Sequence, residues 1–213
     1  ETEKIAQGTY DFRVMREKGY RYVDKTALLY PLVTRDGDGF FFISRPRRFG
    51  KSLMLSTLKC IFQGRRDLFK GLAIDQMDYD WNSYPIISFD FFPVETSSFE
   101  LFKEDLRTTV KQALAEAGAD WDESVSTHLN FAAAIDQLAA ANEHGQVVVL
   151  IDEYDAPVGH ALQDVKKASA IREQLSYIYA QLKSHAAKIR FMMMTGVTRF
   201  TQLSVFSALN NLT

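Results

Sequence analysis

Gly50, Lys51 and Ser52 are the residues of this sequence best suited to chemistry, because their types and order fit the binding of phosphate. They follow an apolar stretch at 40–44 that predicts a strand, and they open a stretch with apolar residues at helical spacing. At the start of a helix, backbone N–H groups and the helix dipole favour an anion. Lysine can reach the outer phosphates of a nucleotide, and a serine hydroxyl can bind Mg²⁺. The segment therefore predicts a nucleotide-binding loop.

The loop before this tripeptide departs from the usual G-x-x-x-x-G-K-[ST] pattern, because Arg45 stands at the first glycine position. Pro46 fixes its own φ, and Arg45 fits its position only with a negative φ, so we expect a loop that differs from the glycine-led form. The loop arginines suit phosphate, but they could also bind a nucleic-acid backbone or a carboxylate elsewhere in the fold. The residues predicted to contact the nucleotide are Arg45, Pro46, Arg47, Arg48, Phe49, Gly50, Lys51, Ser52 and Leu53.

A second candidate segment is the apolar run at 147–151, which leads directly into Asp152 and Glu153. Acidic groups at the end of a buried strand are costly without a partner, and Mg²⁺ beside a nucleotide would supply one. Asp152 is then predicted to hold the metal together with Ser52, and Glu153 to polarise the attacking water. A weaker hypothesis makes Asp155 a further acid near the metal. The alternative is that Asp152 and Glu153 cap the next helix and face solvent.

The third candidate segment, at 192–199, places Thr195 at the end of an apolar run and Arg199 shortly after it. A hydroxyl at that strand end could sense the γ-phosphate or position water. Arg199 could stabilise developing charge, although a solvated arginine without such a role is an equal alternative. The predicted catalytic residues are therefore Lys51, Glu153, Thr195 and Arg199.

The elements that must position these residues alternate along the chain. Predicted strands lie at 40–44, 84–92, 147–151 and 189–194, with helical patterns between them, and this alternation predicts a parallel α/β sheet. A further short strand is expected at 19–23.

Helix starts are predicted from polar residues that can accept backbone hydrogen bonds. Asp24 is expected to cap a helix over Thr26–Val33. Ser97 with Glu100 is expected to cap a helix that ends near Gly118, and Asn130 is expected to cap the next one.

The chain of 213 residues suits one α/β domain, for which we expect an N-terminal extension over residues 1–38 packed on a core over residues 39–213. The net charge of −2 gives no general case for nucleic acid or an anionic membrane as partner. The single cysteine, Cys60, favours a cytoplasmic location, and no apolar run is long enough to span a membrane. The scattered histidines do not predict a zinc site. A start at Glu1 rather than Met suggests a fragment of a longer protein.

Five motifs in this order resemble the predicted AAA-ATPase-like family of bacterial proteins: YVDKT at 22–26, RPRRFGKS at 45–52, LIDEYDAP at 150–157, TGVTRF at 195–200 and FSALNNL at 206–212. The resemblance implies a three-layer P-loop NTPase fold, ATP and Mg²⁺ as cofactors, and Arg45 as part of the family's own pattern. It implies that the strand ending at Thr195 lies between the other two site strands. The family's usual last strand is not evident before Thr213, so the phosphate-loop strand is expected either to be an edge, which would make an oligomer possible, or to be covered by the N-terminal segment. Family members often continue into a domain similar to PD-(D/E)xK nucleases, which is not present in this chain.

Three functions are compatible with these patterns. The first, which we favour, is Mg²⁺-dependent ATP hydrolysis by a module that serves as motor or switch of a larger protein. The absence of a guanine-reading N-K-x-D motif favours ATP. Slow hydrolysis is expected, because an arginine finger is not obvious beyond Arg199 or a neighbouring subunit. The second is a nucleotide- or anion-binding regulatory module without significant hydrolysis. The third is nucleic-acid processing through Arg45, Arg47 and Arg48.

Overall fold

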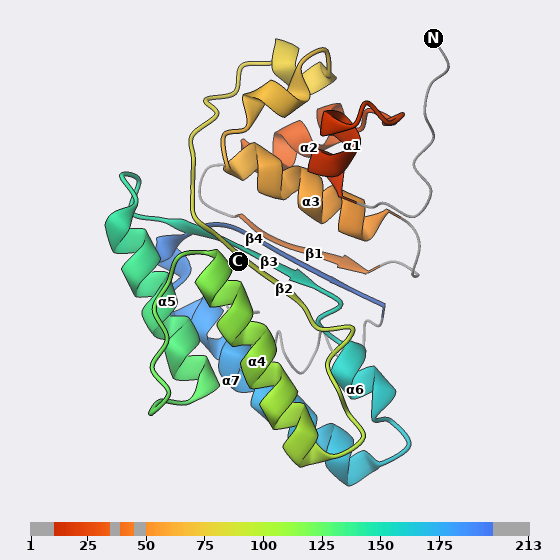
Figure 1. Cartoon of the computed structure of the whole chain (residues 1–213), viewed down its shortest axis with the longest axis vertical. Helices are drawn as coiled ribbons and strands as arrows, with labels where there is room; N and C mark the ends of the chain where they lie inside the picture. Colours follow the sequence, from red (N-terminus) through yellow and green to blue (C-terminus); the bar gives the residue numbers. More distant parts are fainter. Residues whose placement is uncertain (1–10, 35–38, 45–49, 198–213) are drawn as a thin grey trace.

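A computed structural model describes residues 11–34, 39–44 and 50–197 of the chain. Four parallel strands form one sheet with helices on both faces, which confirms the predicted three-layer α/β fold (Figure 1). The strands are β1 (Phe40–Ser44), β2 (Ile86–Asp90), β3 (Val147–Asp152) and β4 (Ile189–Gly196). Their order in the sheet is β1-β4-β3-β2, so the strand that carries Thr195 lies between the other two site strands, as predicted.

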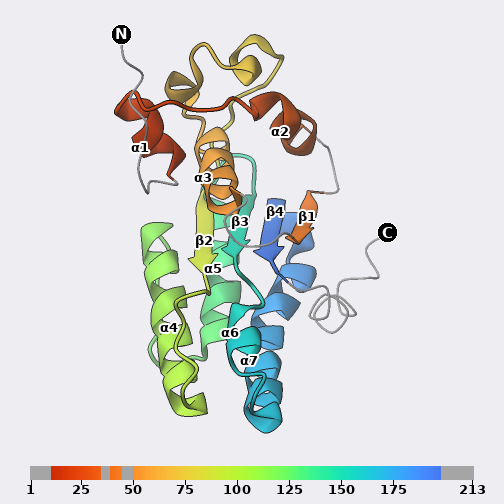
Figure 2. The ribbon, with the colours of Figure 1, turned by 90° about the vertical axis from the view of Figure 1, so that its right-hand side faces the viewer.

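The helices divide between the two faces of the sheet, as Figures 1 and 2 show from two sides. One face carries α1 (Phe12–Glu17), α2 (Thr26–Val33), α3 (Lys51–Phe62) and the short helices η1 (Arg66–Phe69) and η2 (Ala73–Gln76). The other face carries α4 (Phe99–Glu116), α5 (Thr127–Ala141), α6 (Ala156–His160) and α7 (Val165–Ser184). The short helix η3 (Ala186–Lys188) leads into β4.

The central strand β3 explains why its sequence is a continuous apolar run. Successive side chains of a strand point to opposite faces. Val147, Val149 and Ile151 belong to the core shared with α4, α5 and α7. Val148 and Leu150 belong to the core beneath α1, α2 and α3. Both faces of β3 are therefore buried, as is typical of parallel sheets covered by helices on both sides.

Strand β1 is less buried than its sequence predicts. All of its residues are half-buried, although the run Phe40–Ser44 suggested burial on both faces. Within the described residues β1 pairs only with β4, so its other edge has no strand neighbour. The predicted absence of a fifth strand concerns residues up to Thr213, and those after Val197 lie outside the described part of the chain.

Three local predictions were wrong in detail. No strand forms at 19–23, where only Tyr20 makes an isolated bridge. The N-cap of α4 is Ser98 rather than Ser97, and its hydroxyl accepts the Leu101 N–H at 3.2 Å. Asn130 does not cap a helix but lies inside α5, because its buried amide serves the preceding loop instead. Its Nδ2 donates to the Asp122 carbonyl at 2.9 Å and its Oδ1 accepts the Asp122 N–H at 2.8 Å.

The N-terminal helices share a core with α3. Phe12, Leu29 and Val33 are buried in the same cluster as Leu58 and Ile61. The prediction that Asp24 caps α2 was also wrong, because Lys25 is the N-cap, and the Asp24 carboxylate accepts the Thr26 N–H at 2.9 Å from one position earlier. The division of the chain at residues 38 and 39 stays a prediction. Among the described residues, none of the helices has the length and apolar character that a membrane span requires.

Candidate functional site

The helix α3 begins at Lys51 and follows β1 along the chain, as the sequence predicted. Gly50 is the N-cap of the helix and has a φ of 76°, in the left-handed region that glycine adopts at little cost. Its carbonyl accepts the Met54 N–H at 3.0 Å, which closes the first helical turn. Lys51 and Ser52 then occupy the first two positions of the helix, so the helix sets the positions of their Cα atoms.

Lys51 points across the carboxyl end of the sheet. Its Nζ lies 3.3 Å from Oε1 of Glu153 and 3.5 Å from the carbonyl oxygen of Gly196. The Lys51 side chain is 5% exposed and the Glu153 side chain 12% exposed, so the ion pair is nearly buried. Removing one partner of such a pair leaves a buried charge, which makes the two residues depend on each other.

Ser52 and Thr195 both bind the carboxylate of Asp152. The Ser52 hydroxyl donates to Oδ2 of Asp152 at 2.8 Å. The Thr195 hydroxyl donates to Oδ1 of the same group. The half-buried Asp152 carboxylate therefore joins the start of α3 to the end of β4 instead of capping the next helix.

Glu153 has a strained backbone directly after β3. Its φ is 52°, which costs about 1–3 kcal/mol for a residue other than glycine. Its N–H donates to the Thr195 hydroxyl at 3.2 Å, which supports this conformation. Its second carboxylate oxygen, Oε2, is buried and has no hydrogen-bond partner within the described parts of the chain. A buried carboxylate oxygen without a donor is rare in stable proteins, so it marks a position where a ligand, water or ion belongs.

Sequence reasoning missed Asp90, the last residue of β2. Its register partner in β3 is Asp152. Burial raises the pKa of the Asp90 carboxyl, and the charges of Asp152 and Glu153 raise it further. The available signal was an acidic residue near the end of the strand predicted at 84–92, because in a parallel sheet that end lies at the same edge as Asp152.

Several predicted contacts cannot be placed. Arg45, Pro46, Arg47, Arg48 and Phe49 lie outside the described residues, and so does Arg199. Leu53 is described, and its half-buried side chain packs against the core beneath α3. Its nucleotide contact stays a prediction.

The residues present fit Mg²⁺ and a nucleotide. No group of three or more His, Cys, Asp or Glu side chains in the described ranges could hold a metal alone. Mg²⁺ does not need such a group, because it usually keeps several waters and takes one or two protein oxygens with phosphate oxygens. The adjacent Ser52 hydroxyl and Asp152 carboxylate are oxygen ligands of that kind. The nearly buried Lys51 ammonium and the unpartnered Glu153 oxygen lie beside them.

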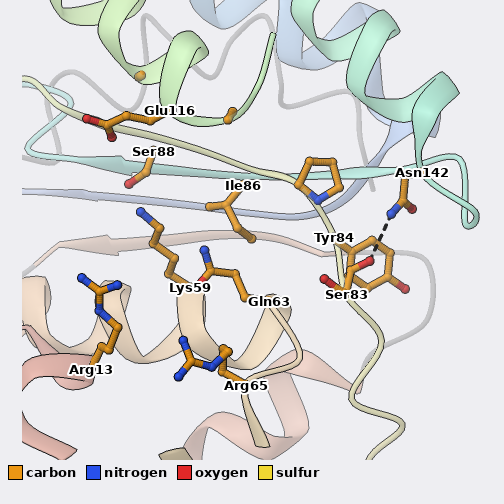
Figure 3. A pocket seen from close by; sticks show the side chains of 13 residues that line it. Arg13, Lys59, Gln63, Arg65, Ser83, Tyr84, Ile86, Ser88, Glu116 and Asn142 are labelled. Atoms are coloured by element: carbon orange, nitrogen blue, oxygen red, sulfur yellow. Dashed lines mark hydrogen bonds between the residues drawn. The ribbon is translucent and has the colours of Figure 1, made fainter. Parts of the chain in front are cut away.

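A cavity of about 530 Å³ lies elsewhere, along β2 (Figure 3). Lys59 and Gln63 of α3 point toward Ile86 and Ser88 of that strand, and Asn142 donates to the Ser83 carbonyl at 3.0 Å. The residues that line this cavity do not include any predicted site residue. The candidate site at the start of α3 is therefore separate from this cavity, and we identify it from the hydrogen bonds and the ion pair described above.

The sheet order and the contacts between α3, β3 and β4 define the class of this protein as an α/β protein of the P-loop-like AAA type. The chain belongs to the family described as "Predicted AAA-ATPase", whose profile matches residues 6–206. This match confirms the resemblance drawn from the five motifs. The family supports an ATPase-like, nucleotide-binding function.

One similar protein is considerably longer than this chain. The chain is 36% identical, over 215 residues, to a protein described as "Uncharacterized protein in vnfD 5'region" from Azotobacter chroococcum mcd 1. The match covers 99% of this chain and 40% of that protein, so the chain spans less than half of the relative's length. No solved structure matches the chain.

Proposed function

We propose that this chain binds ATP with Mg²⁺ and hydrolyses it, as the motor or switch module of a longer protein. The observation that carries the proposal is the convergence of three distant segments. Lys51 contacts Glu153, Ser52 contacts Asp152, and Thr195 contacts both acidic residues. Phosphoryl transfer depends on positioning and charge neutralisation, and these are the groups that such a reaction needs.

Each residue has a role that follows from its contacts. Ser52 and Asp152 would hold Mg²⁺, which would neutralise charge on the phosphates. Lys51 would bind the outer phosphates, since its ammonium contacts Glu153, the residue that follows Asp152. The carboxylate of Glu153 would accept a proton from the attacking water. Lys51 orients this carboxylate, and the Thr195 hydroxyl holds the Glu153 backbone N–H.

The ion pair between Lys51 and Glu153 favours a second candidate, a nucleotide-binding switch with little hydrolysis. While Lys51 holds Oε1 of Glu153, that oxygen is occupied by the ammonium group and is not free to accept a hydrogen bond from water. Phosphate would compete for the Lys51 ammonium and release Glu153. If the release is incomplete, the module binds nucleotide and changes contacts without efficient turnover.

The partners of this module are part of the proposal. The relative's additional length fits a larger protein, and we propose that a C-terminal nuclease-like domain uses the nucleotide state of this module. Oligomerisation through the edge of β1 that has no strand neighbour among the described residues, and nucleic-acid contact through Arg45, Arg47 and Arg48, remain proposals. Affinity for nucleic acid that falls steeply with salt would support the latter.

Isothermal titration with ATP and Mg²⁺, beside a phosphate-release assay, tests the proposal. The wild-type protein should bind and release phosphate, and Lys51→Ala should abolish binding. Lys59→Ala is the matched control, because Lys59 lies on the same helix but lines the distant cavity. Binding without phosphate release would favour the switch. No binding by the wild-type protein would refute both candidates.

A further inference from the structure

A single peptide group, between Gly196 and Val197, connects Asp155 to Lys51. The Val197 N–H donates to both carboxylate oxygens of Asp155, at 3.0 and 3.3 Å. The carbonyl oxygen of the same peptide group, on Gly196, lies 3.5 Å from Nζ of Lys51. Because the N–H and the C=O of one peptide group are coplanar and point in opposite directions, fixing one fixes the other.

Asp155 is well placed to fix this peptide. It is 4% exposed, so water weakens its interaction with the Val197 N–H only slightly. A hydrogen bond from a backbone N–H to a carboxylate is among the strong kinds. Val197 itself is 42% exposed, so packing around its side chain does not hold the peptide in one orientation.

The neighbouring residues pack closely against Gly196. A Cβ on Gly196 would lie 2.3 Å from Cε1 of Tyr154 and 2.8 Å from Oδ1 of Asp155, so only glycine fits. The Tyr154 N–H donates to the Thr195 carbonyl at 2.9 Å. The Tyr179 hydroxyl donates to the Tyr154 carbonyl at 2.9 Å and ties the same turn to α7. Residues 154–155 and 195–197 thus form one packed unit, which we call the strand-end clamp.

We propose that Asp155 is a positioning residue that orients the Gly196–Val197 peptide, so that the Gly196 carbonyl holds Lys51 in front of Glu153. Without the Asp155 carboxylate the peptide can rotate, and Lys51 loses one of the two oxygen contacts described above. The role differs from that of a metal-side acid, which was the sequence-based hypothesis for Asp155. Its effect on catalysis rests on the proposed function, but its effect on Lys51 does not.

Chemical labelling of Lys51 tests the clamp in the absence of nucleotide. The protein is treated with trace acetic anhydride, and acetylation is quantified by mass spectrometry with Lys59 as the internal reference. Asp155→Ala should raise the labelling of Lys51 relative to Lys59 by about tenfold, as expected for loss of a charged hydrogen bond. Asp155→Asn should raise it less, because its amide oxygen still accepts the Val197 N–H. Asp164→Asn is the control, since Asp164 caps α7 away from the clamp.

Unchanged Lys51 labelling in folded Asp155→Ala and Asp155→Asn would overturn the proposal. If neither variant folds, the rate of amide hydrogen exchange at the Val197 N–H of the wild-type protein tests the proposal instead. The clamp predicts exchange at least roughly tenfold slower than in a free peptide. Exchange at the free-peptide rate would contradict it.

Kinetics with ATP separate positioning from metal binding. If Asp155 is a positioning residue, Asp155→Asn should lower kcat. The KM and the Mg²⁺ concentration for half-maximal rate should change little. A large increase in the Mg²⁺ requirement would instead assign Asp155 to the metal and overturn the proposal. If the wild-type protein does not bind ATP, the proposed function fails, while the labelling experiment still tests the clamp.

Discussion

Lys51 and Glu153 form an ion pair with Nζ 3.3 Å from Oε1, although 102 positions separate them in the sequence. Because the pair is nearly buried, each charge depends on the other for stabilisation. In this pair, the lysine of the predicted phosphate loop contacts the acidic residue that is predicted to activate water. Under the proposed function, this one contact would couple nucleotide binding to the activation of Glu153.

The clearest test of Glu153 is Glu153→Gln. Glutamine keeps the shape of the side chain but cannot accept the proton of water, so ATP binding should persist while turnover falls by roughly 100-fold. Titration calorimetry and phosphate release measure the two effects. Glu143→Gln serves as control, because Glu143 is exposed and lies away from the site. Unchanged turnover in Glu153→Gln would remove the assigned role.

Ser52→Ala tests the proposed metal contact. The variant loses the hydroxyl that binds Asp152 at 2.8 Å, so the Mg²⁺ concentration for half-maximal ATP binding should rise by about tenfold. Ser56→Ala is a useful comparison on the same helix, because the Ser56 hydroxyl bonds the Leu53 carbonyl and the Phe12 N–H instead. An equal Mg²⁺ dependence in Ser52→Ala and wild type would argue against this ligand.

Asp90→Asn is expected to raise stability at neutral pH. The pKa of Asp90 is raised in the folded protein, so its ionised form is less stable there than in the unfolded chain. This penalty is present above the raised pKa and disappears below the unfolded value near 3.9. The gain in melting temperature should therefore be largest in metal-free buffer near pH 7.5 and should shrink as the pH falls toward 4. A gain that does not depend on pH would show that charge is not its cause.

Tyr179→Phe tests the buried tie between α7 and the turn after β3. The Tyr154 carbonyl would lose a buried donor, which should cost about 1–2 kcal/mol of unfolding free energy. Tyr177→Phe on the same helix removes an exposed hydrogen bond to Glu173 and should cost much less. Urea unfolding of both variants gives the comparison, and equal costs would show that this tie has no special importance.

The sheet was predictable because its signals are local or topological. Apolar runs identify strands, and parallel strands place their carboxyl ends at one edge, so Lys51, Asp152 and Thr195 were expected at the same edge. The order of strands came from the family resemblance and not from the periodicity.

The clamp was not predictable, because its central contact is made by a backbone N–H. Any residue at position 197 would offer the same donor, so no residue type marks the partner of Asp155. The cap at Ser98 was missed for a related reason. Ser97 and Ser98 are adjacent and chemically alike, and only the geometry of the first turn of α4 distinguishes them.

A crystal structure with Mg²⁺ and a non-hydrolysable ATP analogue tests the central claim most directly. We predict the γ-phosphate beside Lys51, the metal on Ser52 and Asp152, and Glu153 released from Lys51 to face the attacking water. An analogue bound elsewhere, with the Lys51–Glu153 ion pair intact, would contradict the account.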